Sequence, residues 1–137
     1  MPMSENRRIS VKALAFGVLT DIGGSLIVGA AFGLISGIEL VAQGVPENEL
    51  PARLESPIVL VPLLVIGFGF TLLGGFVAGR TSKRAEVTHG GLVGLIGLVF
   101  GLLLSASLPS WYAIASFVGV VPFGMMGGRL AVTDRAE

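Results

Sequence analysis

The sequence predicts an all-α membrane protein, a polytopic bundle of four transmembrane helices that forms a single membrane domain over residues 1–137. Three observations predict this class: the composition, four long apolar runs and the positions of the basic residues. Hydrophobic residues make up 53% of the chain and charged residues only 13%, and 21 residues are glycine. Soluble domains carry about 25% charged residues and about 7% glycine, so lipid is the expected surrounding of this chain.

Four apolar runs are long enough to be transmembrane helices. They cover approximately residues 11–42, 57–79, 88–108 and 111–132. A helix rises about 1.5 Å per residue and needs about 20 residues to cross about 30 Å of hydrocarbon. Buried strands are usually about 4 to 8 residues long, and these runs lack the alternating pattern of a barrel strand. Because lipid offers the backbone no hydrogen-bonding partner, we expect a helix in each run.

The basic residues predict the orientation of the helices. Eight of the nine lysine and arginine residues fall on one side of a four-helix topology: Arg7, Arg8, Lys12, Arg80, Lys83, Arg84, Arg129 and Arg135. The loop at 43–56 carries only Arg53, among three glutamates. The positive-inside rule assigns the basic side to the cytoplasm, so we expect a multi-pass protein of the cell membrane with cytoplasmic N- and C-termini. Trp111 and Tyr112 begin the fourth run at the opposite surface, where aromatic residues are enriched.

The N-terminal residues partly resemble a twin-arginine export signal. Residues 6–12 contain the pair Arg7 and Arg8 and precede an apolar run. The apolar core of a cleaved signal is about 7 to 15 residues long, and this run is much longer. We therefore expect the first helix to be retained.

Small residues recur at four-residue intervals within the runs. Lipid tails are as apolar as leucine, so transmembrane helices associate through close backbone packing, which small residues allow. We expect helix-packing faces at Ser25, Gly29, Gly33 and Gly37, at Gly67, Thr71, Gly75 and Gly79, at Gly90, Gly94, Gly97, Gly101 and Ser105, and at Gly124 and Gly128. Two interpretations stay open. Either one chain uses all of these faces internally, or at least one face binds a second copy or another membrane protein, which predicts a homo-oligomer or a membrane-protein partner.

The first and third runs share features of an internal repeat. A shift of 68 residues aligns Thr20 with Thr88 and also aligns four further pairs of identical residues: Gly29 with Gly97, Phe32 with Phe100, Gly33 with Gly101 and Leu34 with Leu102. Both halves would begin on the same side of the membrane. The pattern therefore favours a tandem duplication of a two-helix hairpin, unlike the inverted repeats of many transporters.

Two acidic residues, Asp21 and Glu39, lie inside an apolar run. A carboxylate at the centre of the bilayer costs about 2.5 to 3.5 kcal/mol, so an acidic residue at that depth indicates a functional site. The 17 residues between the two acids span about 25 Å of helix, which is nearly the thickness of the hydrocarbon. The sequence therefore also allows both carboxylates to lie at opposite membrane surfaces.

Asp21 and His89, which the repeat aligns with each other, form the candidate proton or ion site together with their neighbours Thr20 and Thr88. Histidine titrates near neutral pH, and an aspartate facing it can hold a proton or bind a cation. We expect no metal site, because a first-row metal needs three or four ligands and the chain has one histidine and no cysteine.

The sequence contains no pattern of a catalytic or nucleic-acid-binding protein. It lacks a phosphate-binding loop and a nucleophile elbow, and its formal net charge is zero. A nucleic-acid-binding protein would carry a basic patch or stripe. We therefore expect no enzymatic activity, no cofactor and no nucleic-acid partner, with the lipid bilayer as the surrounding of the chain.

Two segments resemble a pattern in small archaeal and bacterial membrane proteins of unassigned function. The first segment is Gly74-Gly75-Phe76-Val77-Ala78-Gly79-Arg80, and the second is His89-Gly90-Gly91-Leu92-Val93-Gly94. Those proteins are similar to this chain in being rich in glycine and in lacking an enzymatic signature. The likeness reaches the first run only through Asp21-Ile22-Gly23-Gly24. It implies a four-helix membrane protein and assigns no functional residue.

The sequence leaves three functional hypotheses open. The first is a membrane protein that acts through glycine-mediated helix packing and self-association. The second is a small component of a proton- or ion-coupled transporter or channel that uses Asp21 and His89. The third is an accessory subunit that binds a larger membrane complex.

Overall fold

The computed structural model describes residues 9–104 and 108–134, and every regular element in these two stretches is a helix. Four helical segments are long and apolar enough to cross a membrane: Val11–Ala42, Pro57–Ser82, Glu86–Leu104 and Ser110–Thr133. The prediction of a helical chain with four candidate membrane spans is confirmed. Some of the predictions fall outside the described residues. They concern the basic residues Arg7, Arg8 and Arg135, the packing residue Ser105, and residues 105–107 of the third predicted helix.

The first span consists of three consecutive helical segments. It begins with α1 (Val11–Val18), continues as a π-helical turn η1 (Leu19–Gly23) and ends with α2 (Gly24–Ala42). The hydroxyl of Ser10 caps α1 by accepting a hydrogen bond from the backbone N–H of Ala13 at 3.3 Å. The sequence predicts one uninterrupted helix here. The π-turn is a local widening of that helix, and it contains Asp21.

The connections between the spans differ in length, and the first is the longest. The loop after α2 contains the small helix α3 (Leu50–Leu54), which the sequence analysis does not predict, and α4 (Pro57–Ser82) begins with a proline at its first position. Proline is favoured there because the first helical N–H has no intrahelical partner. Lys83, with a positive φ of 57°, ends α4 in the left-handed conformation that terminates many helices. The helix α5 (Glu86–Leu104) follows at once.

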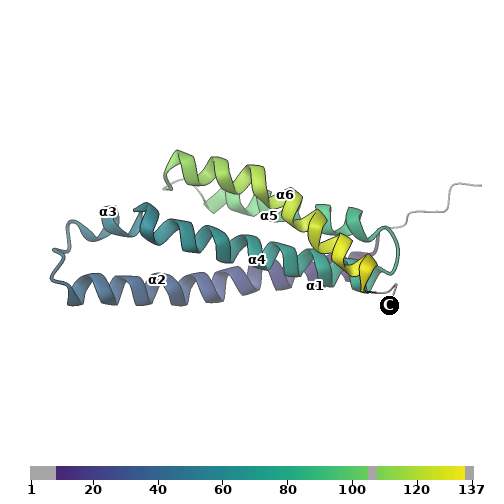
Figure 1. The fold of residues 1–137 in the computed structure, drawn as a ribbon, viewed down its shortest axis with the longest axis horizontal. Coiled ribbons are helices and arrows are strands. Elements are labelled where there is room, and N and C mark those ends of the chain that lie inside the picture. Colours follow the sequence, from purple (N-terminus) through teal and green to yellow (C-terminus); the bar gives the residue numbers. More distant parts are fainter. Residues whose placement is uncertain (1–8, 105–107, 135–137) are drawn as a thin grey trace, which may run out of the picture.

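Two hairpins of unequal length lie side by side (Figure 1). Helices α4 and α5 contact each other, α6 (Ser110–Thr133) packs on both, and α1 and η1 also pack on α4 and α5. The start of α1 and the end of α6 lie at the same end of the helices, which we call the basic end because Lys12, Arg80 and Arg129 lie there. The opposite, or α3, end holds α3 and the start of α6. The α2–α4 hairpin extends beyond the α5–α6 hairpin at the α3 end.

Near the basic end, the helix backbones touch one another at glycine residues. A Cβ atom added to Gly75 of α4 or to Gly90 of α5 would collide with the carbonyl oxygen of Gly124 in α6. A Cβ at Gly17 of α1 would lie 2.7 Å from the Gly74 carbonyl oxygen. Real Cβ contacts are essentially never that short, so these positions accept only glycine without a shift of the backbone. The spans are therefore tightly joined at this end.

The predicted small-residue faces divide into two groups. An added Cβ would lie within 3.2 Å of a neighbouring atom at Gly75, Gly79, Gly90, Gly94, Gly97, Gly124 and Gly128. No atom lies within 4 Å of that position at Gly33, Gly37, Gly67 or Gly101, and at Gly29 only a Leu63 methyl group does, at 3.6 Å. The open glycines lie in the halves of their helices nearer the α3 end. Packing in the described part of the chain is therefore close at the basic end and loose at the other.

Ring contacts and one ion pair complete the packing between α4 and α6. The rings of Phe68 and Phe123 stack with their centroids 4.6 Å apart. Arg80 pairs with Asp134 just after α6, and its guanidinium lies over the ring of Phe76. The tandem duplication stays a prediction. Its first copy contains the π-turn η1, whereas α5 is described as regular α-helix over Glu86–Leu104.

Candidate functional site

The carboxyl group of Asp21 is buried between helices. Asp21 is only 4% exposed, and its Oδ1 atom accepts a hydrogen bond from the Thr71 hydroxyl of α4 at 2.9 Å. The same hydroxyl lies 3.1 Å from the Gly67 carbonyl oxygen in its own helix. A hydroxyl has one proton to donate and two lone pairs that accept. Thr71 can therefore donate to the carboxyl or to the carbonyl oxygen, and it can accept a hydrogen bond while donating.

The second carboxyl oxygen of Asp21 lies against α5. A Cβ atom at Gly97 would be 2.9 Å from Oδ2, so the absence of a side chain at Gly97 makes room for the carboxyl group. Among the described residues, no hydrogen-bond donor reaches Oδ2. In that part of the chain, every fully buried side-chain nitrogen or oxygen atom has a hydrogen-bond partner. Because Oδ2 has none, it is not fully buried. Because Asp21 lines a cavity, we infer that Oδ2 faces it.

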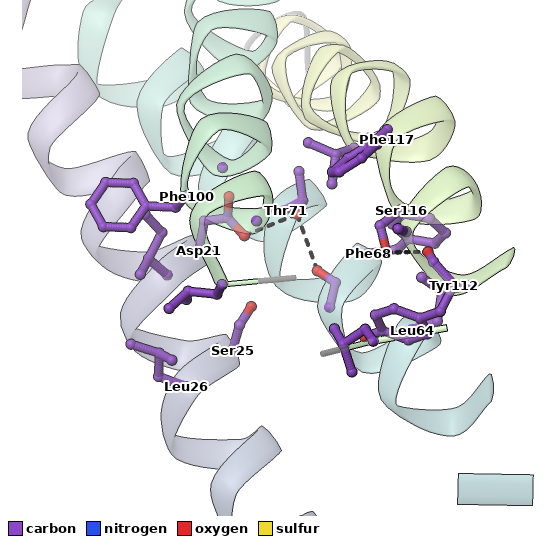
Figure 2. Close-up of a pocket in the computed structure, with 18 residues that line it drawn as sticks. Asp21, Ser25, Leu26, Leu64, Phe68, Thr71, Phe100, Tyr112, Ser116 and Phe117 are labelled. Atoms are coloured by element: carbon purple, nitrogen blue, oxygen red, sulfur yellow. Dashed lines mark hydrogen bonds between the residues drawn. The ribbon is translucent and has the colours of Figure 1, made fainter. Parts of the chain in front are cut away.

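A cavity of about 250 Å³ extends from Asp21 between α2, α4, α5 and α6. Figure 2 shows Asp21 and Thr71 at one side and Tyr112 and Leu64 at another. Tyr112 stands near the start of α6, so the cavity runs from Asp21 toward the α3 end. Its wall is mostly apolar. The aromatic side chains in it are Phe68, Phe100, Tyr112 and Phe117, and the aliphatic hydroxyl groups are those of Ser25, Thr71 and Ser116.

Asp21 lies near the middle of the helices that surround it. It follows the start of α1 by about ten residues, and Thr71 and Gly97 are each about eleven residues from the basic end of α4 and α5. At about 1.5 Å per residue, these separations are roughly 15 to 17 Å, or half of a 30 Å hydrocarbon layer. Glu39 is exposed near the end of α2, about 27 Å farther along the helix. Of the two acids, only Asp21 therefore lies among packed helices.

His89 is anchored elsewhere. It is 1% exposed in the first turn of α5, and its Nε2 atom accepts a hydrogen bond from the Ser10 backbone N–H at 2.9 Å. The Nδ1 atom, 3.0 Å from the Ala85 carbonyl oxygen, then carries the ring proton and donates it to that oxygen. Because both nitrogens have backbone partners, His89 fastens the start of α1 to α5.

The four residues of the predicted ion site do not come together. About eight residues of α5, or roughly 12 Å, separate His89 from Gly97, beside which the Asp21 carboxyl lies. The Thr20 hydroxyl donates to the Phe16 carbonyl oxygen at 2.8 Å, and Thr88 is exposed. Neither threonine lines the cavity. The hydroxyl that does reach Asp21 belongs to Thr71, which the sequence analysis assigns only to a helix-packing face.

The cavity includes residues that the sequence analysis does not assign to an ion site. Ser25, Gly67, Gly97 and Gly101 are predicted as packing residues and instead line the cavity, and the aromatic residues and Ser116 have no predicted role in a site. Their spacing alone carries no signal, because they come from four helices. No group of three or more potential metal ligands occurs among the described residues.

No protein-family model matches this sequence, and no curated protein or solved structure is significantly similar to it. Function is therefore inferred from the geometry around Asp21.

Proposed function

We propose that this chain is a small multi-pass protein of the cell membrane that binds and releases a proton or a monovalent cation at Asp21, as a component of cation-coupled transport. The observation that carries the proposal is a single carboxyl group, buried near the middle of the spans, with one oxygen bound by Thr71 and the other open to a cavity. His89 takes no part in it, since both of its ring nitrogens have backbone partners.

Electrostatics supports a bound cation at this position. An isolated carboxylate at the centre of a membrane helix costs about 2.5 to 3.5 kcal/mol. A proton or a cation on the carboxylate neutralises it. No lysine, arginine or histidine lines the cavity in the described part of the chain, so a positive charge must come from outside the protein.

The hydrogen bonds of Thr71 suit both states of such a site. When Asp21 is ionised, the Thr71 hydroxyl donates to Oδ1. When Asp21 is protonated, its O–H can donate to the Thr71 oxygen while Thr71 donates to the Gly67 carbonyl oxygen. A proton can therefore bind to Asp21 and dissociate from it while the Thr71 hydroxyl and Asp21 Oδ1 stay hydrogen-bonded to each other. The π-turn around Asp21 is a second supporting feature, because such turns are rare and frequently mark functional sites.

The positions of the basic residues support access from one side. The positive-inside rule puts the basic end, with both termini, in the cytoplasm. The glycine contacts between helices close that end, whereas the cavity extends toward the α3 end. In this conformation we infer that cations reach Asp21 from the side opposite the cytoplasm.

The test is cation flux in vesicles. Purified protein is reconstituted with a pH-sensitive dye inside, a pH gradient is imposed, and dye fluorescence is followed for the natural chain, Asp21→Asn and Glu39→Gln. Asparagine keeps the size of the side chain but does not ionise, so we expect Asp21→Asn to abolish flux. Glu39→Gln, which changes an exposed acid of α2, serves as the matched control and should retain flux. Equal flux in the natural chain and Asp21→Asn refutes the proposal.

A second candidate function is self-association through α2. None of the residues of α2 is buried, and Gly33 and Gly37 have open space where a neighbouring helix would fit. Small residues allow close helix contact in lipid, so this face suits a second copy of the chain. Gly33→Leu should then reduce cross-linked dimers and leave the helical content unchanged, whereas Leu34→Ala should not affect dimers. A different protein co-purifying at a fixed ratio would instead support an accessory subunit.

A further inference from the structure

We propose that the cavity at Asp21 binds a small organic ammonium cation that carries an apolar group. This inference rests on the proposed binding of a cation at Asp21 and names its chemical class. The cavity joins one carboxylate oxygen to a mostly apolar, partly aromatic wall. That combination matches a ligand with a positive head and an apolar body.

The mostly apolar wall of the cavity suits an organic cation better than a bare inorganic one. A channel filter replaces the hydration shell of such an ion with rings of oxygen atoms. Here the side-chain oxygens of the lining are one carboxyl group and the hydroxyls of Ser25, Thr71, Tyr112 and Ser116, which stand on three different helices and form no ring. Within the cavity lining, Asp21 is the acidic residue, and its Oδ2 atom has no donor among the described residues. An ammonium group with alkyl or aromatic substituents needs only one counter-charge and gains from apolar contact.

Aromatic rings provide that contact. Phe68, Phe100 and Phe117 line the cavity, and Figure 2 shows Phe100 on one side and Phe68 and Phe117 on the other. A cation near the face of an aromatic ring is attracted by about 0.5 to 2 kcal/mol, depending on its exposure to water. The Phe68 ring is held in place, because it stacks on Phe123 with an angle of 6° between the ring planes. The Phe68 ring is therefore already ordered before a ligand binds.

Charge and size limit the ligand further. Asp21 and Tyr112 are the titratable residues among the described residues that line the cavity, so the site balances one positive charge. Ligand sites usually enclose about 300 to 1,000 Å³, and a cavity of about 250 Å³ suits a molecule smaller than a typical drug. A lipid ammonium headgroup is a poor fit, because Asp21 lies roughly 15 Å from the basic end of the helices and, measured along α4 from Thr71 to Pro57, roughly 20 Å from the α3 end.

The test measures protection of the Asp21 carboxyl from a hydrophobic carbodiimide. The full-length protein is reconstituted in vesicles of phosphatidylglycerol, whose headgroup carries no amine, and the labelled residue is identified by mass spectrometry. The probe is benzyltrimethylammonium, which is permanently charged and cannot donate a proton. We expect it to prevent labelling of Asp21, whereas sodium chloride at the same concentration does not. Adding phosphatidylethanolamine to the vesicles should leave labelling unchanged, and protection by that lipid would assign the site to a headgroup.

A pair of phenylalanine variants tests the aromatic wall. Phe100→Ala removes an exposed ring that lines the cavity, and we expect the concentration for half-protection to rise about fivefold. Phe16→Ala removes a similarly exposed ring of α1 outside the cavity and should leave that concentration unchanged. Equal effects of the two variants contradict the inference.

The outcomes separate this inference from the function on which it rests. If the carbodiimide does not label Asp21 at all, the carboxyl is not reachable and the proposed function fails. If it labels Asp21 but only sodium protects, the site binds an inorganic cation and the organic-cation inference is wrong. If neither cation protects, the site binds protons alone, which also overturns the inference while the proposed function stands.

Discussion

Replacing Gly75 by alanine should weaken the packing of α4 against α6. The added Cβ atom would collide with the carbonyl oxygen of Gly124. Gly69 offers a matched control in the same helix, because an added Cβ there meets no atom within 4 Å. Any difference in stability between Gly75→Ala and Gly69→Ala therefore reports the contact between the two helices.

The expected difference in the free energy of unfolding between the two variants follows from two contributions. Each substitution gains about 1 kcal/mol of helix propensity, and this gain cancels between the variants. Inserting extra atoms into a well-packed site costs about 1 to 3 kcal/mol. The upper part of that range applies at Gly75, because the obstructing atom belongs to the backbone and cannot rotate away. We expect Gly75→Ala to be about 2 to 3 kcal/mol less stable than Gly69→Ala, a factor of about 30 or more in the ratio of folded to unfolded protein.

Unfolding in mixed micelles measures this difference. Sodium dodecyl sulfate is added stepwise to each variant in a mild detergent, and far-UV circular dichroism and the fluorescence of Trp111 are recorded. Gly75→Ala should unfold at a lower fraction of dodecyl sulfate, and Gly69→Ala at or slightly above that of the natural chain. Coinciding transitions for the two variants would refute the close approach of α4 and α6.

Three further substitutions test two neighbours of the buried carboxyl group and the anchor formed by His89. Thr71→Val removes the donor to that group, and hydrogen bonds to charged groups contribute about 1.5 to 3 kcal/mol, so flux should fall about tenfold or more while Thr71→Ser retains it. Gly97→Ala places a Cβ atom 2.9 Å from the carboxyl oxygen and should reduce carbodiimide labelling, whereas Gly101→Ala, with open space, should not. His89→Leu removes the acceptor of the Ser10 N–H, so amide exchange at the start of α1 should accelerate, and unchanged exchange would argue against the anchor.

The number and type of the long helices could be predicted from the sequence, because apolar length alone decides them. The short helix α3 and the π-turn could not. A π-turn at Leu19–Gly23 depends on how the chain fits Asp21 between α4 and α5, and hydropathy does not record that fit. The apolar pattern on either side of the turn reads as one continuous helix.

The candidate site could be predicted only in part. Asp21 stands out in the sequence because an acid inside an apolar run is costly. The predicted pairing of Asp21 with His89 rests on the alignment of two apolar runs. In the structure the partner of Asp21 is Thr71, because the depth and rotation of the packed helices determine which side chains meet. The glycines show the same limit. Gly33 and Gly75 occupy similar four-residue patterns, yet only Gly75 meets another backbone, because contact depends on where the helices diverge.

The glycine contacts between α4, α5 and α6 have a mechanical consequence. Where backbones touch directly, no side chain lies between them that could change its rotamer, so we expect these three helices to move together near the basic end. Helix α2 has no buried residue, its close glycine contact is with the Phe70 side chain at Gly24, and it joins α1 through η1. If the cavity changes in width, we therefore expect α2 to move and η1 to act as the hinge. Asp21 lies in η1, so such a movement would displace the carboxyl group less than the far end of α2.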